Sequence, residues 1–284
     1  MPTIISWNIN GIRSNIVGGK HLSNKKAKYT SIDPETNLGE IIKNYNPDIL
    51  CFQEIKCDSK VATDTFQFPE YHQYFNSSKG VGARTGSRYS GTSIWTKEKP
   101  ENVLYNIPDF EDNEGRVIIA EYTDFILINT YVPNSGSNFD YRIFEWNVAI
   151  NTYLTSSTLI DKNKYIIWTG DLNVAYTIND TCYTTSKYKS STISGCLKEE
   201  INDFKCILDS GFVDAYRKFK NPEETEYTWF FNQRCRELNK GMRIDYFIVD
   251  DRLAEKVLDC GVINDSGLKT TPLGSDHLAI YLKW

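Results

Sequence analysis

Short runs of β-branched and aromatic residues recur along the whole chain, and stretches with a helical spacing of apolar residues lie between them. Each run is bounded by Gly, Pro, Asn or Asp, which are typical of turns. The runs predict strands over Thr3–Trp7, Ile49–Phe52, Thr92–Trp95, Val117–Glu121, Phe125–Tyr131, Tyr165–Trp168, Tyr227–Phe231, Asp245–Val249 and Leu278–Leu282. The helical spacing predicts helices over Asn37–Tyr45, Tyr141–Leu154 and Lys198–Leu208.

The first of these helices has a recognisable start, because Asn37 with Glu40 three residues later resembles a capping box. Helices fall between strands, and no Ser- or Gly-rich linker divides the chain. We therefore expect residues 1–284 to form a single α/β domain with two sheets.

The composition excludes several classes of protein. With 40% hydrophobic and 24% charged residues, the chain is unlike collagen, coiled coils or disordered proteins. No apolar run approaches the about 18 residues that cross a membrane, and no signal-peptide pattern precedes Thr3, so we expect no membrane association. The net charge of −5 argues against a protein that coats nucleic acid by bulk attraction, so local basic groups must meet any polyanion.

The seven cysteines are odd in number and irregularly spaced, without a C-x-x-C pair. We expect them to be reduced thiols of an intracellular protein in the nucleus or the cytoplasm. Together with the missing signal pattern, they disfavour a secreted protein.

Two segments, residues 11–30 and 79–90, carry basic residues without acidic ones. Solvated surface loops would have the same composition, but these segments are also the best candidates for contacts with a polyanion. The candidate residues for contacts with a polyanion are Arg13, Lys25, Lys26, Lys28, Arg84 and Arg88, followed by Lys56 and Arg243.

Polar residues interrupt the chain where the predicted strands begin or end. Any one of them could be an ordinary turn residue. As a set they match what loops at one edge of an α/β fold contribute to an active site. The set contains Asn8, Asn10, Glu54, Tyr131, Asn134, Asp171, Asn173, Asp245, Asp276 and His277.

These residues lie in longer motifs that span the chain from Thr3 to Leu282. In order, the motifs are Trp7-Asn8-Ile9-Asn10-Gly11-Ile12-Arg13, Gln53-Glu54-Ile55-Lys56, Glu114-Gly115-Arg116-Val117, Tyr131-Val132-Pro133-Asn134, Gly170-Asp171-Leu172-Asn173-Val174, Arg243-Ile244-Asp245-Tyr246-Phe247 and Ser275-Asp276-His277. Together they resemble the exonuclease III family of AP endonucleases, within the endonuclease/exonuclease/phosphatase superfamily.

The resemblance implies a four-layer α/β sandwich, in which two mixed β-sheets pack face to face with helices on both outer faces. It also implies Mg²⁺-dependent cleavage of double-stranded DNA on the 5′ side of an abasic site, leaving a 3′-hydroxyl and a 5′-deoxyribose phosphate. Mn²⁺ is expected to substitute for Mg²⁺, and 3′-phosphodiesterase and 3′→5′ exonuclease activities to accompany the cleavage. We expect the enzyme to act as a monomer.

The same resemblance assigns the metal site. It makes Glu54 the principal metal carboxylate, with Asn10 and Asp276 completing or alternating in the metal shell. Asn8 would orient that shell and Asn134 would support it. One Glu, one Asp and an amide suit Mg²⁺, which prefers oxygen ligands and keeps several waters.

The resemblance also assigns the groups that act on the phosphodiester. Tyr131 and Asn173 would contact the scissile phosphate, and Asp171 would position or deprotonate the attacking water. His277 would bind a phosphate oxygen, oriented by Asp245. A charged histidine needs such an anionic partner to raise its pKa, and donors aimed at the phosphate oxygens stabilise the charge that gathers there.

The chain departs from the family pattern at three places. Asn10 stands where many members have Asp, which favours one tightly held Mg²⁺ over two. Met242 stands where a Trp usually packs the abasic-site pocket, so Trp229 and Phe230 become candidates to complete the wall, although Trp229 could equally be plain core. The segment 14–37 is longer than the family loop.

Two other functions stay open from the sequence. One is a superfamily phosphodiesterase or phosphatase acting on an inositol phosphate, a sphingolipid or a tyrosyl-DNA adduct. The other is a non-catalytic DNA-binding protein that keeps the fold, which would be expected to have lost at least one of Glu54, Asp171, Asp245 and His277. All four are present.

Overall fold

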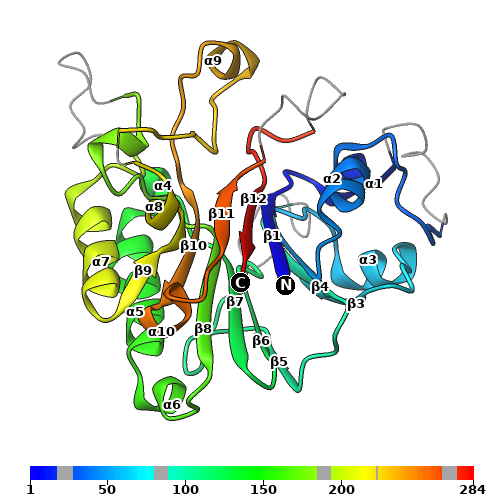
Figure 1. Cartoon of the computed structure of the whole chain (residues 1–284), viewed down its shortest axis with the longest axis horizontal. Helices are drawn as coiled ribbons and strands as arrows, with labels where there is room; N and C mark the ends of the chain where they lie inside the picture. The colour runs from blue at the N-terminus through cyan, green and yellow to red at the C-terminus, as the bar shows by residue number, and fades with distance from the viewer. Residues whose placement is uncertain (18–27, 80–88, 184–192, 222, 264–273) are drawn as a thin grey trace.

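The computed structural model describes the chain apart from residues 18–27, 80–88, 184–192, 222 and 264–273. Its strands form two six-stranded mixed sheets (Figure 1). The first sheet has the order β11-β12-β1-β2-β4-β3 and the second the order β5-β6-β7-β8-β10-β9. In each sheet one parallel pair, β1 with β2 or β7 with β8, is flanked by antiparallel strands.

The strands of the first sheet are β1 (Thr3–Asn8), β2 (Ile49–Gln53), β3 (His72–Asn76), β4 (Thr92–Thr96), β11 (Asp259–Val262) and β12 (Ile280–Lys283). Those of the second are β5 (Asn102–Leu104), β6 (Val117–Glu121), β7 (Phe125–Tyr131), β8 (Tyr165–Asp171), β9 (Phe212–Asp214) and β10 (Asp245–Asp250).

The strands present apolar side chains to both faces of each sheet, so each sheet is covered on both sides. Alternate residues such as Ile4 and Ile167 meet between the sheets in a central core. The other faces, with residues such as Ile5 and Trp168, pack against helices. The expected four-layer sandwich is therefore confirmed.

Three helices cover the first sheet, α1 (Ile12–Val17), α2 (Asn37–Tyr45) and α3 (Ser59–Thr65). On the second sheet lie α5 (Asn147–Leu154) and α7 (Lys198–Asp209), and α4 (Ser135–Asp140) and the π-helical turn η2 (Tyr141–Trp146) lead into α5. The remaining short helices are α6 (Ser157–Ile160), η3 (Ile178–Asp180), α8 (Ala215–Phe219), α9 (Gln233–Glu237) and α10 (Asp251–Ala254).

Every strand that the sequence pattern missed lies at the edge of a sheet. These strands are β3, β5, β9 and β11. Edge strands have a neighbour on one side only, and β5 has no buried residue and β3 has one. The mostly buried β9 and β11 are only 3 and 4 residues long, too short for an alternating pattern to stand out. The prediction of a strand over 227–231 was wrong, because Trp229 makes only isolated bridges, to Met242 and to His277.

The predicted helices are confirmed, with two differences. The cap of α2 is Thr36 rather than Asn37, since the Thr36 hydroxyl accepts the amide of Gly39. The helix expected over 141–154 begins as a π-helical turn and runs directly on from α4.

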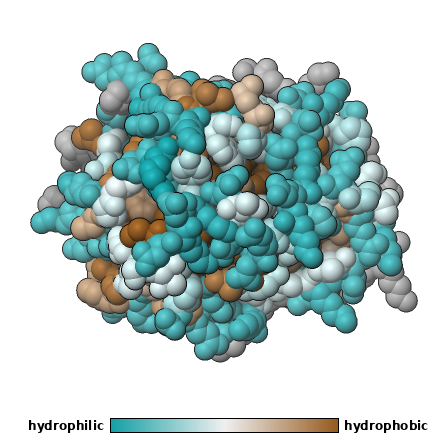
Figure 2. All heavy atoms as spheres, turned by 60° about the horizontal axis from the view of Figure 1, so that its bottom comes forward, coloured by the Kyte–Doolittle hydropathy of each residue, from teal (hydrophilic) through white to brown (hydrophobic). Residues whose placement is uncertain are grey.

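The strand register brings the motif residues to one edge of the sandwich. Tyr131 pairs with Asp171 across β7 and β8, and Asp171 pairs with Asp245 across β8 and β10. In Figure 1 this is the edge beside which α9 projects. The surface that Figure 2 turns forward, from the bottom of Figure 1, is mostly hydrophilic with small separate apolar spots. None of the helices in the described part of the chain has the length and hydropathy of a membrane span.

Candidate active site

One buried amide joins the two sheets at the site. Asn8, at the end of β1, donates from Nδ2 to Oε1 of Glu54 at 3.0 Å and to Oδ2 of Asp171 at 2.9 Å. Glu54 follows β2 in the first sheet, whereas Asp171 ends β8 in the second. Asn8 therefore bridges two carboxylates from different sheets, a position from which it could orient them.

A histidine and two aspartates form the deepest part of the site. Nδ1 of His277 lies 2.9 Å from Oδ2 of Asp245, and Nε2 lies 3.7 Å from Oδ2 of Asp171. Burial alone would lower the pKa of His277, but the charges of Asp245 and Asp171 raise it to about 10. The imidazole is thus a cation at neutral pH, and Asp245 is its hydrogen-bonded anionic partner.

For Asp171, burial has a larger effect on the pKa than the neighbouring charges do. Burial raises its pKa to about 7, helped by the nearby charge of Asp245 and opposed by His277 and by the Asn8 hydrogen bond. A carboxylate whose pKa lies near neutrality can accept a proton from a water molecule during catalysis. This matches the role that the resemblance gives to Asp171.

The expected metal-binding residues are connected through a lysine. Nζ of Lys56 lies 2.7 Å from Oε2 of Glu54 and also donates to Oδ1 of Asn10. Nδ2 of Asn10 donates to Oδ1 of Asp276 at 2.9 Å. Oxygens of Glu54 and Asn10 therefore already converge on a cation, and such a set of carboxylate and amide oxygens fits Mg²⁺.

Glu54, Asp171 and His277 also come close together, with one ligand atom of each within 4.8 Å of the others. A protonated imidazole has no lone pair to offer a metal, so the high pKa of His277 argues against it as a ligand. Burial would raise the pKa of Glu54, but Lys56 and Asn8 hold it below its usual value. Glu54 is accordingly the anionic centre of the oxygen set.

Two asparagines and a tyrosine line the site beside Asp171. Nδ2 of Asn173 donates to the Val132 carbonyl at 2.8 Å, and Nδ2 of Asn134 lies 3.3 Å from Oδ1 of Asn173. Burial and the charge of Glu54 raise the pKa of Tyr131 well above its usual value, so its hydroxyl remains a proton donor. The structure brings all three to the cavity where the resemblance expects them.

At this edge several non-glycine residues have a positive φ, a backbone conformation that residues with a side chain rarely adopt. Asn10, Glu54, Lys56 and Asn173 all have a φ between 48° and 51°. Left-handed conformations at non-glycine residues are costly and gather at functional sites. Gly170 is required where it stands, because its φ is +132° and an added Cβ would lie 1.9 Å from the Thr130 carbonyl oxygen.

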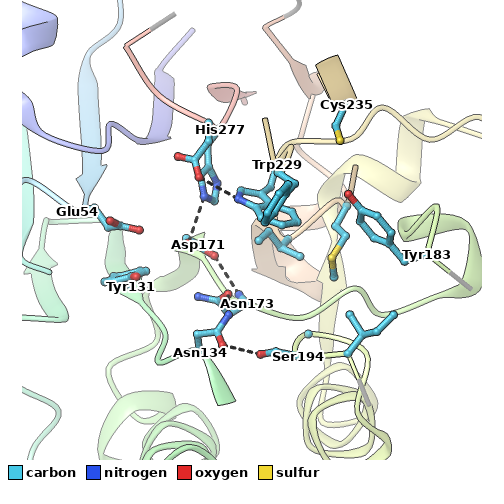
Figure 3. Close-up of a pocket in the computed structure, with 16 residues that line it drawn as sticks. Glu54, Tyr131, Asn134, Asp171, Asn173, Tyr183, Ser194, Trp229, Cys235 and His277 are labelled. Carbon is cyan, nitrogen blue, oxygen red and sulfur yellow. Dashed lines mark hydrogen bonds and ion pairs between the residues drawn. The ribbon is translucent and has the colours of Figure 1, made fainter. Parts of the chain in front are cut away.

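The catalytic side chains form one end of a cavity of about 500 Å³ (Figure 3). In Figure 3, Glu54 and Tyr131 lie on one side, Asp171 and His277 in the middle, and Trp229 on the other. The far wall is largely apolar. It is lined by Tyr183, Ile193, Trp229, Phe231, Cys235, Met242 and Ile244.

Of the three residues predicted at the wall, Trp229 and Met242 line this cavity and Phe230 does not. Phe230 is 4% exposed and packs in the core between the sheets. Its neighbour Phe231 instead lines the cavity, is 70% exposed and makes an edge contact with Trp229. Adjacent side chains of an extended segment point in opposite directions. The run of aromatic residues in the sequence does not show which of Phe230 and Phe231 points toward the cavity.

The structure places the basic residues that were expected to bind DNA in different environments. Arg243 was a wrong prediction: it is 1% exposed and pairs with Asp180 and Asp214 at 2.7 Å each. Lys56 is engaged by Glu54 inside the site. Arg13 is partly buried against Cys57, whereas Lys28 is exposed. Lys25, Lys26, Arg84 and Arg88 lie outside the described residues.

Sequence reasoning also missed basic residues beside the cavity. Arg234 in α9 and Lys240 just after it are exposed, next to the cavity-lining Phe231 and Cys235. Because the acidic Glu237 lies between them, the segment did not stand out in the sequence as a run of basic residues without acidic ones. A search for basic residues flanking an aromatic pocket motif could have found them.

Comparison with known proteins agrees with this geometry. Residues 5–277 match the Endonuclease/Exonuclease/phosphatase family. The chain belongs to the Endonuclease/Exonuclease/phosphatase family.

Family relatives cover almost the whole chain. A DNA-(apurinic or apyrimidinic site) endonuclease of Dictyostelium discoideum is 36% identical over 98% of this chain and 69% of its own length. An exodeoxyribonuclease of Bacillus subtilis is 32% identical over 98% of both chains. Among solved structures, an AP endonuclease from Archaeoglobus fulgidus has a TM-score of 0.75 at 27% identity, covering 100% of this chain and 99% of its own. The expected family, fold and enzyme class are thereby confirmed.

Proposed function

We propose that this family member is a DNA-repair endonuclease that hydrolyses the phosphodiester 5′ to an abasic site in double-stranded DNA. The observation that carries the proposal is the continuity of the cavity, in which phosphodiester chemistry at one end adjoins an aromatic and apolar wall at the other. Such a wall can accept a bare deoxyribose turned out of the helix and exclude a normal base by shape. The relatives from Dictyostelium and Archaeoglobus, both named as AP endonucleases, support the same activity.

The residues suggest how the reaction would run. Asp171 holds the attacking water and takes its proton, because its raised pKa places it near neutrality. His277 donates from Nε2 to a non-bridging phosphate oxygen, and the hydroxyl of Tyr131 and the amide of Asn173 supply further donors. These donors face the charge that develops in the transition state.

Glu54, Asn10 and Asp276 would hold a divalent cation, which we propose is Mg²⁺, with Mn²⁺ able to replace it. When bound, this cation neutralises charge on the phosphate and on the leaving 3′ oxygen. The ammonium group of Lys56 must then turn away from the oxygens it contacts in the structure.

Three narrower features complete the proposal. The name of the Bacillus relative, exodeoxyribonuclease, supports an exonuclease activity, which we propose runs 3′→5′, and a 3′-phosphodiesterase activity would use the same groups. We propose that the protein acts as a monomer. None of its seven cysteines is in a disulfide, which supports a reducing compartment such as the nucleus or the cytoplasm.

A matched set of oligonucleotides tests the function. A duplex with one tetrahydrofuran abasic analogue is incubated with and without Mg²⁺, beside the undamaged duplex and a 3′-recessed duplex. We expect Mg²⁺-dependent incision directly 5′ to the analogue, with little internal cleavage of undamaged DNA. If the protein instead releases phosphate from inositol phosphates or cleaves a tyrosyl-DNA adduct faster than it incises the abasic duplex, the proposal is wrong.

A further inference from the structure

A buried arginine holds the two active-site loops from behind. Nη1 of Arg142 donates to the Pro133 carbonyl at 2.9 Å, and Nη2 donates to the Leu172 carbonyl at 3.1 Å. We infer that Arg142 is a positioning residue, whose guanidinium sets the distance between the loop that carries Asn134 and the loop that carries Asp171. The inference rests on the proposed phosphodiester hydrolysis.

Each loop supplies groups to the cavity immediately beside the carbonyl that Arg142 binds. Pro133 directly precedes Asn134, and Leu172 stands between Asp171 and Asn173. On the cavity side, the loops meet through the bond from Asn173 to the Val132 carbonyl and through the Asn134–Asn173 contact. Arg142 supplies the matching connection on the far side, so the loops are tied at front and back.

Those two carbonyls have few alternatives for hydrogen bonding. Pro133 and Leu172 are both buried, and Leu172 is 1% exposed. A buried carbonyl without a donor is costly, so loss of the guanidinium would push each loop toward another donor. A planar guanidinium can bind two acceptors at a fixed separation, which a single ammonium group cannot reproduce.

The surroundings of Arg142 keep it charged and in place. It is 3% exposed, and burial lowers its pKa to about 10, with the charge of Glu200 opposing the shift. It therefore remains protonated at neutral pH. Glu200 and Asp203 line the same cavity of about 10 Å³ behind the loops, and Nε of Arg142 makes no hydrogen bond with the described residues.

The local helix geometry explains how an arginine reaches this position. Arg142 lies in the π-helical turn η2, between the partly exposed Tyr141 and the buried Ile143. A π-helical turn inserts a residue into the normal helical spacing and shifts the following face, and such turns are frequent at functional sites. Here the turn aims a cation at the two loops while Trp146 stays in the core of the helical layer.

The test compares the same change at two arginines. Arg142→Met removes the donors and keeps most of the volume. Arg217→Met is the control, because Arg217 donates to Asp180, to Thr225 and to the Asn221 carbonyl, which all lie outside the two active-site loops. Arg142→Lys keeps the charge but cannot span both carbonyls. Each protein is measured for kcat and KM on the abasic duplex, for Tm, and for the side-chain amide NMR signals of Asn134 and Asn173 without metal.

We expect Arg142→Met to lower kcat by about 10- to 100-fold with KM changed less than about 3-fold, because a small misplacement of catalytic groups costs rate rather than binding. The amide signals of Asn134 and Asn173 should shift. Arg142→Lys should keep the Tm near that of the native protein and still lower kcat by at least about 5-fold. Arg217→Met should lower Tm and leave both kcat and these signals nearly unchanged.

A native kcat and unshifted amide signals in Arg142→Lys would overturn the inference, and this variant decides the matter if Arg142→Met does not fold. A drop in Tm for Arg142→Met with kcat retained within about 2-fold would also overturn it, since Arg142 would then be structural only. The amide signals are recorded on the metal-free protein without substrate, so they do not depend on which substrate the enzyme cleaves. If the native protein does not incise abasic DNA while Arg142→Lys still shifts the amide signals, the proposed function is wrong and the positioning role stands.

Discussion

The indole Nε1 of Trp229 donates a hydrogen bond to Oδ2 of Asp276 at 3.0 Å. This bond links the apolar wall of the cavity to a carboxylate of the expected metal shell. The backbone repeats the link, because Trp229 is bridged to Met242 on one side and to His277 on the other. Part of the wall, Trp229 and Met242, is therefore connected directly to the segment that carries Asp276 and His277.

Replacing Trp229 by Ala should impair the choice between abasic and intact DNA more than it slows 3′→5′ degradation. The reason is that an aromatic wall excludes a normal base by shape and accepts a bare sugar. The ratio of incision rates on abasic and undamaged duplexes measures this selection. Trp229→Phe is the control that keeps a ring and removes only the bond to Asp276. Equal loss of both activities with a lower Tm would instead mark Trp229 as a core residue.

Removing either central carboxylate should abolish turnover without unfolding the protein. Glu54→Gln and Asp171→Asn should each lower kcat by at least about 10³-fold, since both act on the developing charge of the transition state. High Mg²⁺ should partly rescue Glu54→Gln. Single-turnover incision over a Mg²⁺ titration measures this, and near-native rates at low Mg²⁺ would contradict the assignment of Glu54 to the metal.

Asp171→Asn should also leave the protein at least as stable as before at pH 8. Burial raises the folded pKa of Asp171 to about 7, above its ordinary value, so its ionised form is disfavoured in the folded state and reduces stability at higher pH. A neutral amide avoids that cost. Urea unfolding of the metal-free proteins at pH 5 and pH 8 tests the sign. A variant that is much less stable at pH 8 would contradict it.

His277 should stay protonated through neutral pH in the metal-free protein. Its pKa in the folded protein is raised to about 10, whereas an unfolded histidine titrates at about 6.5. The pairing with Asp245 therefore contributes its full stability below about pH 6.5 and loses it as the pH rises toward 10. The imidazole NMR signals measure the titration directly.

Asp245→Asn supplies the comparison for that experiment. It should bring the His277 titration down and lower stability more at pH 6 than at pH 10. The difference between native and variant proteins isolates this pair from Asp171, which titrates in the same range. A His277 that titrates near pH 6.5 in the native protein would exclude the cationic imidazole.

Replacing both Arg84 and Arg88 with Ala should flatten the dependence of log affinity on log salt by about one to two units, since each phosphate contact contributes about 0.9. KM should rise, while single-turnover chemistry at saturating DNA stays nearly intact. Binding to the abasic duplex from low to high KCl measures the slope. An unchanged slope would direct attention to Arg234 and Lys240, which are exposed beside the cavity.

The inner strands could be predicted from the sequence because most of them are buried along their length. β1, β4 and β10 have no exposed residue, so their apolar runs stand out from the turns around them. Their polar ends stand out for the same reason, and Glu54, Asp171 and His277 are recognisable because each interrupts or adjoins such a run.

The tertiary structure decided what depends on neighbours distant in sequence. The edge strands β3 and β5 are defined by hydrogen bonds to a partner strand, since their own side chains are largely exposed or partly buried. Arg243 looks like a surface base in the sequence, and only its pairing with Asp180 and Asp214 shows that it is a core cation. An isolated charge says nothing about its partner.

The sequence by itself determined a two-sheet α/β domain, because local patterns encode burial, and its motifs carried the family resemblance that implied the four layers and the chemistry of the site. Only the tertiary structure decided that Phe231 rather than Phe230 lines the cavity, and that Arg142 ties together loops carrying Asn134 and Asp171. The first feature depends on which side of the segment faces the cavity, and the second on a hydrogen bond to the Leu172 carbonyl, 30 residues from Arg142 along the chain. They arise from long-range packing, which short sequence windows do not contain.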